Sequence, residues 1–211
     1  MGSTLDLALA RRVLPVIVLD DAGAARPLAD ALLAGGLPCA EITLRTPEAL
    51  RAIESLAARD DGFIVGAGTV LSASDVADAV SAGAQFLLSP ALDDKLLETA
   101  AEAGVPLIPG VASATEVLRC IRQGVNLVKL FPAAALGGPA LVAALAAVFP
   151  RVRFIPTGGI DAAAAGSYLA LPSVAAVGGS WMASQHLIAN SRYAEITALT
   201  SDAVRAAAGG R

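Results

Sequence analysis

A lysine inside an apolar run is the residue of this sequence with the clearest capacity for chemistry. The run extends from Asn126 to Pro132 and follows Gly124, which is typical of a buried strand in a parallel sheet, and Lys129 lies in its middle. Only Lys95 and Lys129 among the 15 basic residues are lysines, so a general preference for lysine does not explain the position. Burial removes water from an ammonium group and favours the neutral amine, which attacks ketones to form Schiff bases. The alternative is a lysine near a strand end that extends its charged group to water.

Charged residues also interrupt a second apolar segment, at positions 39–45. Side chains alternate between the two faces of a strand, so this segment predicts one apolar face toward the helices and one polar face toward the interior of the fold. The two sets are Ala40, Ile42 and Leu44, and Glu41, Thr43 and Arg45. Unpaired buried charge is costly, so the structural alternative is a Glu41–Arg45 ion pair. We favour a functional site, because Lys129 adds a third charge that could meet the other two.

Glycines follow three other apolar runs. Gly66-Ala67-Gly68-Thr69 lacks the third glycine of a dinucleotide-binding fingerprint, since Leu71 stands there, so we expect Gly68 to admit a ligand and the Thr69 hydroxyl to donate to it. Two further runs end in Thr157-Gly158-Gly159 and Gly178-Gly179-Ser180. Their backbone N–H groups, with a short helix expected over 180–186, predict a phosphate site.

The elements that must position these residues form a regular series. Eight apolar runs, each followed by a turn and an alanine-rich helical pattern, predict a parallel eight-stranded (β/α)8 TIM barrel. The runs begin near Leu14, Cys39, Phe63, Gln85, Pro106, Leu127, Arg153 and Val174. The helical patterns cover Ala22–Ala34, Pro47–Ala58, Ser74–Ser81, Asp93–Ala103, Ser113–Gln123, Pro139–Phe149 and Ala162–Leu169. We expect a single domain over residues 1–211 with an N-terminal helix and a C-terminal helix over Ser191–Ala208. A doubly wound open sheet is the competing architecture.

Composition narrows the classes of function. With 55% hydrophobic and 16% charged residues, the 211-residue chain can bury a large core and is not disordered. The net charge of −4 favours neither a nucleic-acid nor a membrane partner. The uncharged stretch between Lys129 and Arg151 is broken by prolines, and the helix that remains possible within it is too short to cross a membrane. The single histidine, His186, argues against most hydrolase triads and against multi-histidine metal sites. We expect two free buried thiols and a cytoplasmic protein.

An amine and a carboxylate without a metal cluster suggest imine chemistry on a keto acid. In this hypothesis Arg45 and Thr69 bind the carboxylate of the substrate, Lys129 attacks its ketone, and Glu41 acts as general acid and base. The ring of Phe131 would keep water from the imine. No metal and no cofactor are expected.

Six segments resemble those of the bacterial 2-keto-3-deoxy-6-phosphogluconate (KDPG) aldolases. In order along the chain they are AEITLRT (40–46), VGAGTVL (65–71), IPGV (108–111), VKLFP (128–132), PTGGI (156–160) and VGGSW (177–181). The resemblance implies a class I aldolase of the Entner–Doudoroff pathway, usually a homotrimer of barrels, that yields pyruvate and glyceraldehyde 3-phosphate from a keto-acid phosphate.

The resemblance also assigns roles residue by residue. It makes Lys129 the Schiff-base lysine and Glu41 the acid and base. The substrate-binding positions are Arg45 and Thr69 for the carboxylate, Pro90 and Phe131 for the pocket wall, and Thr157, Gly158, Gly159, Gly178, Gly179 and Ser180 for the distal and phosphate end. Ala134 departs from the family, in which many members carry an acidic residue there; this concerns the local loop and subunit contacts.

Several alternatives remain open at the level of sequence. Members of the family often also cleave 4-hydroxy-2-oxoglutarate, and the related phosphogalactonate aldolases differ most in the loop at 178–181, where this chain resembles the gluconate type. A phosphate-sugar isomerase or epimerase would use Glu41 as base without an imine at Lys129. A barrel that only binds a ligand is the non-enzymatic alternative.

Overall fold

Parallel strands joined by helices make up the fold. The computed structural model of the protein describes residues 4–209. Six strands form one sheet in the order β5-β4-β3-β2-β1-β9, and three form a second in the order β6-β7-β8. Their bounds are Val13–Ile17 (β1), Cys39–Thr43 (β2), Ile64–Gly68 (β3), Leu87–Leu88 (β4), Leu107–Ile108 (β5), Gly110–Val111 (β6), Leu127–Leu130 (β7), Arg153–Pro156 (β8) and Val177–Gly179 (β9). Each pairing between these strands is parallel, which confirms the predicted α/β class.

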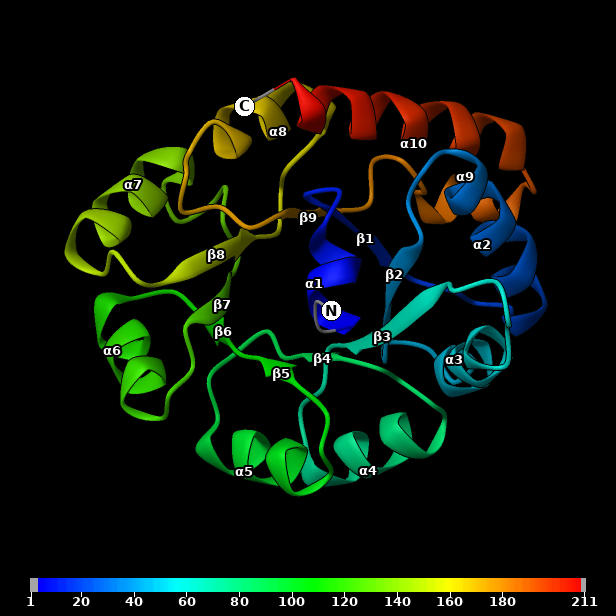
Figure 1. The fold of residues 1–211 in the computed structure, drawn as a ribbon. Helices are drawn as coiled ribbons and strands as arrows, with labels where there is room; N and C mark the ends of the chain where they lie inside the picture. Colours follow the sequence, from blue (N-terminus) through cyan, green and yellow to red (C-terminus); the bar gives the residue numbers. More distant parts are fainter. Residues whose placement is uncertain (1–3, 210–211) are drawn as a thin grey trace.

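The two sheets approach one another at both of their edges. Strands β5 and β6 are separated only by Pro109, which has no N–H to continue a ladder. At the other edge, isolated bridges join Phe154 to Val174 and Thr157 to Gly178. In Figure 1 the strands surround the short N-terminal helix α1, and the longer helices lie outside the strands.

The helices occupy the predicted stretches. Their bounds are Thr4–Leu9 (α1), Ala22–Ala24 (η1), Ala25–Ala34 (α2), Ala49–Ala57 (α3), Ala73–Ser81 (α4), Asp94–Glu102 (α5), Ala114–Arg122 (α6), Gly138–Val148 (α7), Ala162–Leu169 (α8), Gln185–Ala189 (α9) and Tyr193–Ala208 (α10). Side chains cap several of the amino ends: Ser72, Asp93, Ser113 and Asp161 each accept a hydrogen bond from a backbone N–H in the first turn. These caps explain why the sequence pattern locates the helices well.

The short helix expected over 180–186 is an error of the sequence prediction. Residues 180–183 form a turn, in which the Ala183 N–H donates to the Ser180 carbonyl at 3.1 Å. Helix α9 begins only at Gln185, because the Ser184 hydroxyl accepts from the Leu187 N–H and so caps the first turn. The amino end of this helix therefore does not lie at Ser180.

The apolar core has two parts, which follow from the alternation along each strand. The larger cluster fills the space between strands and helices, and it includes Ala40 and Ile42, with Leu44 packed against it, as the alternation in segment 39–45 predicts. The smaller cluster lies on the opposite face of the strands. Its members are Ala8, Leu14, Cys39, Ile64, Phe86, Leu88, Ile108, Ile155 and Ala175.

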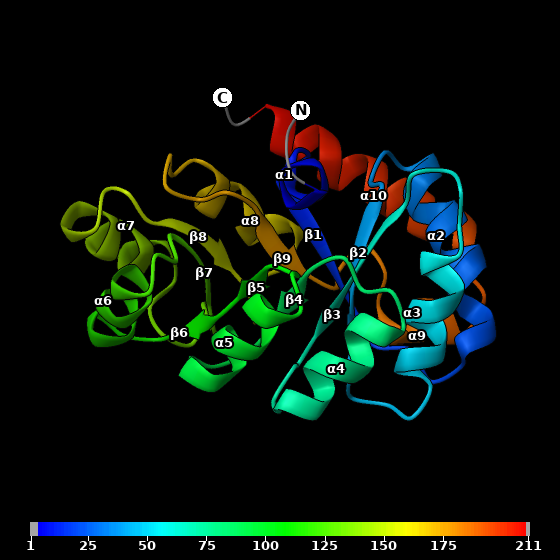
Figure 2. The same ribbon diagram turned by 60° about the horizontal axis from the view of Figure 1, so that its bottom comes forward.

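Helix α1 packs on this smaller cluster at the amino ends of the strands. Leu5 and Leu9 contact the cluster, and the Cys39 thiol donates to the Ala8 carbonyl at 3.1 Å. Figure 2 shows α1 above the start of β1. Both cysteines are free and buried, as predicted, and burial raises the pKa of the Cys39 thiol to about 12.

Among residues 4–209, no helix has the length and hydropathy needed to cross a bilayer.

Candidate active site

Lys129 and Glu41 meet in the interior of the fold. Lys129 lies on β7 and is 4% exposed, and Glu41 lies on β2 and is fully buried. The Lys129 Nζ donates to Glu41 Oε1 at 3.0 Å. The second oxygen of Glu41, Oε2, is buried and has no hydrogen-bond partner among the described residues. A buried carboxylate oxygen without a donor is energetically costly and is available to a bound molecule.

Neighbouring strands hold Lys129 from both sides. In the ladder, Lys129 lies opposite Gly110 of β6 and Ile155 of β8. Two residues along the chain, the half-buried Phe131 places its ring centroid 5.6 Å from Lys129 Nζ. The amine is thus bordered by an aromatic ring and an apolar strand, and it does not extend to bulk water.

Two of the three residues predicted to form the polar face of segment 39–45, Glu41 and Thr43, are buried, and the third, Arg45, is not. Thr43 is buried, and its hydroxyl donates to the Ile17 carbonyl at 2.9 Å, so this hydroxyl supports β1 and β2. Arg45 is exposed just beyond the end of β2, and its side chain forms no hydrogen bond or ion pair with residues 4–209. The Glu41–Arg45 ion pair considered from the sequence does not form, because Lys129 is the partner of Glu41.

Thr69 and Pro90 lie at the carboxyl ends of β3 and β4. Thr69 is half-buried and has a φ of 59°, in the left-handed region that residues other than glycine rarely adopt. Such strain concentrates at functional sites. Pro90 is half-buried, and its backbone lies so close to Gly110 that a Cβ on that glycine would be 2.2 Å from the Pro90 carbonyl oxygen.

The two glycine pairs lie at the ends of β8 and β9, which adjoin. Thr157 is buried and bridges to Gly178, so the two loops start side by side. Gly158 contacts the Phe131 ring: an ideal Cβ on it would be 3.1 Å from Phe131 Cε2. Gly179 is buried, whereas Gly159 and Ser180 are exposed. The structure therefore connects the predicted phosphate end to the Lys129 neighbourhood through Phe131.

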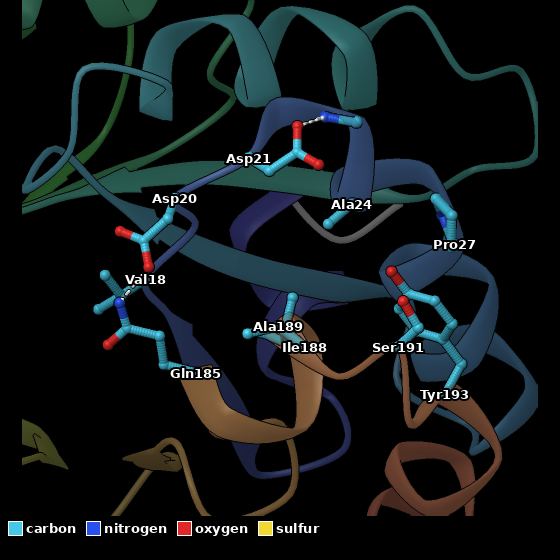
Figure 3. Close-up of a pocket in the computed structure, with 11 residues that line it drawn as sticks. Val18, Asp20, Asp21, Ala24, Pro27, Gln185, Ile188, Ala189, Ser191 and Tyr193 are labelled. Atoms are coloured by element: carbon cyan, nitrogen blue, oxygen red, sulfur yellow. Dashed lines mark hydrogen bonds between the residues drawn. The ribbon is translucent and has the colours of Figure 1, made fainter.

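A pocket of about 500 Å³ between the end of β1 and α9 has no counterpart in the sequence patterns. Figure 3 shows Asp20 and Gln185 joined by a hydrogen bond at one side of it and Tyr193 at the other. The lining residues come from two segments far apart in the chain, so no local motif marks the pocket. None of them is a predicted site residue.

The fold and the site together define a class of protein. Parallel strands with intervening helices, and a buried lysine that contacts a buried carboxylate, are the features of an α/β enzyme with an amine nucleophile. A family model described as KDPG and KHG aldolase matches residues 6–199. The chain belongs to this family.

Several aldolases are similar to this chain in sequence and in structure. The 2-dehydro-3-deoxy-phosphogluconate aldolase of Pseudomonas aeruginosa is 44% identical over 92% of this chain and 88% of its own. The KHG/KDPG aldolase of Escherichia coli K12 is 44% identical over 92% of each chain. Among solved structures, the KDPG aldolase of Legionella pneumophila, with pyruvate captured at low pH as a covalent carbinolamine intermediate, has a TM-score of 0.90 and 43% identity, covering 95% of this chain and 97% of that one.

The buried ion pair generates a prediction about stability. Lys129→Met leaves the buried Glu41 carboxylate without its partner, and we expect a loss of about 3–5 kcal/mol in the free energy of unfolding. Lys129→Met combined with Glu41→Met removes both charges and should lose markedly less, because two apolar side chains replace the pair. Urea unfolding followed by circular dichroism measures both values. Equal losses in the two variants would contradict a buried charge pair.

Proposed function

We propose that this protein is a class I aldolase that cleaves KDPG to pyruvate and glyceraldehyde 3-phosphate. The observation that supports this most directly is the 3.0 Å contact between Lys129 Nζ and Glu41 Oε1 in a water-poor interior. An amine needs a partner that can move protons before it can form an imine, and Glu41 is the carboxylate within reach. Membership in an aldolase family agrees with this reaction.

The geometry supports a sequence of balanced steps. Glu41 first takes a proton from the Lys129 ammonium group, so that the neutral amine can add to the C2 ketone of the substrate. Glu41 then gives this proton to the oxygen, and loss of water leaves a protonated imine. The imine draws electrons from the C3–C4 bond while Glu41 takes the proton of the C4 hydroxyl, so the bond breaks and the aldehyde leaves. The enamine that remains takes a proton from the protonated Glu41, and hydrolysis of the resulting imine releases pyruvate and frees Lys129. The Phe131 ring, 5.6 Å from Nζ, limits the access of water to the imine.

The remaining site residues have proposed roles in binding. Arg45 lies at the rim, from where its long side chain can rotate toward a bound carboxylate, and the hydroxyl of Thr69 is the second donor. Pro90 and Phe131 form the wall. The glycine-rich ends of β8 and β9 bind the phosphate; their members are Thr157, Gly158, Gly159, Gly178, Gly179 and Ser180. A relative from Zymomonas mobilis, 42% identical, was solved with 3-phosphoglycerate, a phosphate ester.

Cleavage of 4-hydroxy-2-oxoglutarate is a second proposed activity. The Escherichia coli relative is named KHG/KDPG aldolase, in which KHG stands for 2-keto-4-hydroxyglutarate, the same compound as 4-hydroxy-2-oxoglutarate. We propose KDPG as the preferred substrate and 2-keto-3-deoxy-6-phosphogalactonate as the alternative. A cleavage assay coupled to lactate dehydrogenase, run on all three compounds, ranks them by kcat/KM.

The proposed architecture is one domain over residues 1–211, formed by an eight-stranded (β/α)8 barrel. Two features support closure: only Pro109 separates β5 from β6, and the Thr157–Gly178 bridge joins the other edges. We propose a cytoplasmic homotrimer. Light scattering should then give three times the 21.0 kDa mass of the chain, and a monomeric mass would contradict it.

Reductive trapping tests the covalent step. Borohydride added in the presence of pyruvate should reduce the imine and attach a three-carbon group to Lys129, which peptide mass spectrometry locates. Lys129→Met should show no such modification. An unmodified Lys129 at saturating pyruvate would favour the isomerase or epimerase alternative, in which no imine forms.

Substitution of Glu41 tests the acid–base role. Glu41→Gln keeps the size of the side chain but removes the group that accepts protons, so we expect kcat to fall about 10²-fold or more. Lys95→Ala is the matched control, because Lys95 is exposed on α5 and pairs only with Glu98, at 3.2 Å, among the described residues. It should leave kcat and KM unchanged. A Glu41→Gln enzyme with native kcat would contradict the acid–base role of Glu41, whereas a native protein that binds these compounds without turnover would favour a barrel that only binds ligands.

A further inference from the structure

Gly68, the last residue of β3, lies directly against the Glu41 side chain. An ideal Cβ built on Gly68 would be 2.0 Å from Glu41 Oε1 and 2.6 Å from both its Cδ and its Cγ. Cβ atoms in proteins do not approach other heavy atoms this closely. The carboxylate that contacts Lys129 therefore occupies space that any other residue at position 68 would fill.

Glu41 has little freedom to move out of the way. It is fully buried, and β2 and β3 are fixed to one another by five consecutive paired positions, which include Glu41 with Gly66 and Thr43 with Gly68. The Leu44 N–H also donates to the Gly68 carbonyl at 2.8 Å. Backbone displacement at this point would break the ladder that carries the site.

The neighbouring position on the same face of β3 is also occupied. Residues two apart along a strand face the same side, so Gly66 and Gly68 form one surface. An ideal Cβ on Gly66 would be 2.2 Å from the Phe86 ring. The inner face of β3 thus has two glycines, of which one makes room for a core side chain and the other for the site carboxylate.

We propose that Gly68 is a positioning residue, which holds the Glu41 carboxylate at the Lys129 amine because it has no side chain. This inference rests on the proposed acid–base role of Glu41. Gly68→Ala would force the carboxylate away from Lys129 Nζ and slow the proton transfers, whereas the other residues proposed to bind the substrate would keep their positions.

A double-mutant cycle tests the proposal. Gly68→Ala alone should lower kcat about 10²-fold, the usual scale of a lost general acid–base group, with KM changed by no more than a few-fold. In a Glu41→Ala background the displaced side chain is absent, so adding Gly68→Ala should lower neither kcat nor the unfolding midpoint further. Gly68→Ala that lowers kcat of Glu41→Ala by the same factor as it lowers that of the native enzyme would overturn the proposal. A Gly68→Ala enzyme with the kcat of the native enzyme would also overturn the proposal.

Two alanine substitutions at other glycines serve as matched controls. A Cβ on Gly166 of α8 would meet no atom within 4 Å apart from its chain neighbours and the backbone of its own helix, so Gly166→Ala should leave kcat unchanged. Gly66→Ala displaces Phe86 rather than Glu41, so its effect on the unfolding midpoint should persist in the Glu41→Ala background. If Gly68→Ala does not fold, the double variant with Glu41→Ala should recover folding, and its failure to do so would also overturn the proposal.

A failure of the proposal for Gly68 can be distinguished from a failure of the proposed aldolase mechanism. Absence of imine trapping at Lys129 in the native enzyme would refute the aldolase mechanism alone. The unfolding midpoints of the same variants would still show whether a side chain at position 68 competes with Glu41 for the same space.

Discussion

The structure depends on an ion pair held away from water. Removing an ammonium group and a carboxylate from water costs several kcal/mol for each ion, and their attraction offsets this only in good geometry. Lys129 and Glu41 have that geometry, but Glu41 Oε2 remains without a donor among the described residues. A pair selected for stability alone would satisfy both oxygens. The residual cost is of the kind that proteins retain at sites of function.

Much of the surrounding structure serves to keep this pair in place. The ladder connects Lys129 to β6 and β8, and it connects Glu41 to β1 and β3, so each charge is held between two strands. Small residues occur where site residues need room, as Gly68 does beside Glu41 and Gly158 beside Phe131. The larger apolar cluster lies behind the strands and fixes the helices against them.

The sequence could predict those features that depend on local pattern. The alternation in segment 39–45 correctly assigned Ala40 and Ile42 to the helix-facing core, because strand geometry leaves each residue only two directions. Helix positions were also predictable, since cap residues such as Asp93 and Asp161 act within one turn. The position of Lys129 within an apolar run indicated a buried lysine, and of the two charges that we expected it to meet, Glu41 and Arg45, the structure brings only Glu41 to it.

Several features that require two distant segments were not predictable. The contact between Gly68 and Glu41 exists only because β2 and β3 pair in one register, and the pocket near Asp20 requires α9 to return to β1. Arg45 has the parity of Glu41, but the strand ends before it, so alternation no longer controls its direction. The start of α9 depended on the choice between two serines, Ser180 and Ser184, that a single sequence does not distinguish.

Helix α1 covers the amino ends of the strands, and this limits the side from which a ligand can reach Lys129. Below the level of Lys129 the interior contains Leu14, Cys39 and Phe86, and Ala8 of α1 covers them. We therefore expect the substrate to reach Lys129 from the carboxyl ends of the strands. The pyruvate fragment stays bonded to Lys129 until its imine is hydrolysed, so the aldehyde departs first, and both products leave on the side of the strands that α1 does not cover.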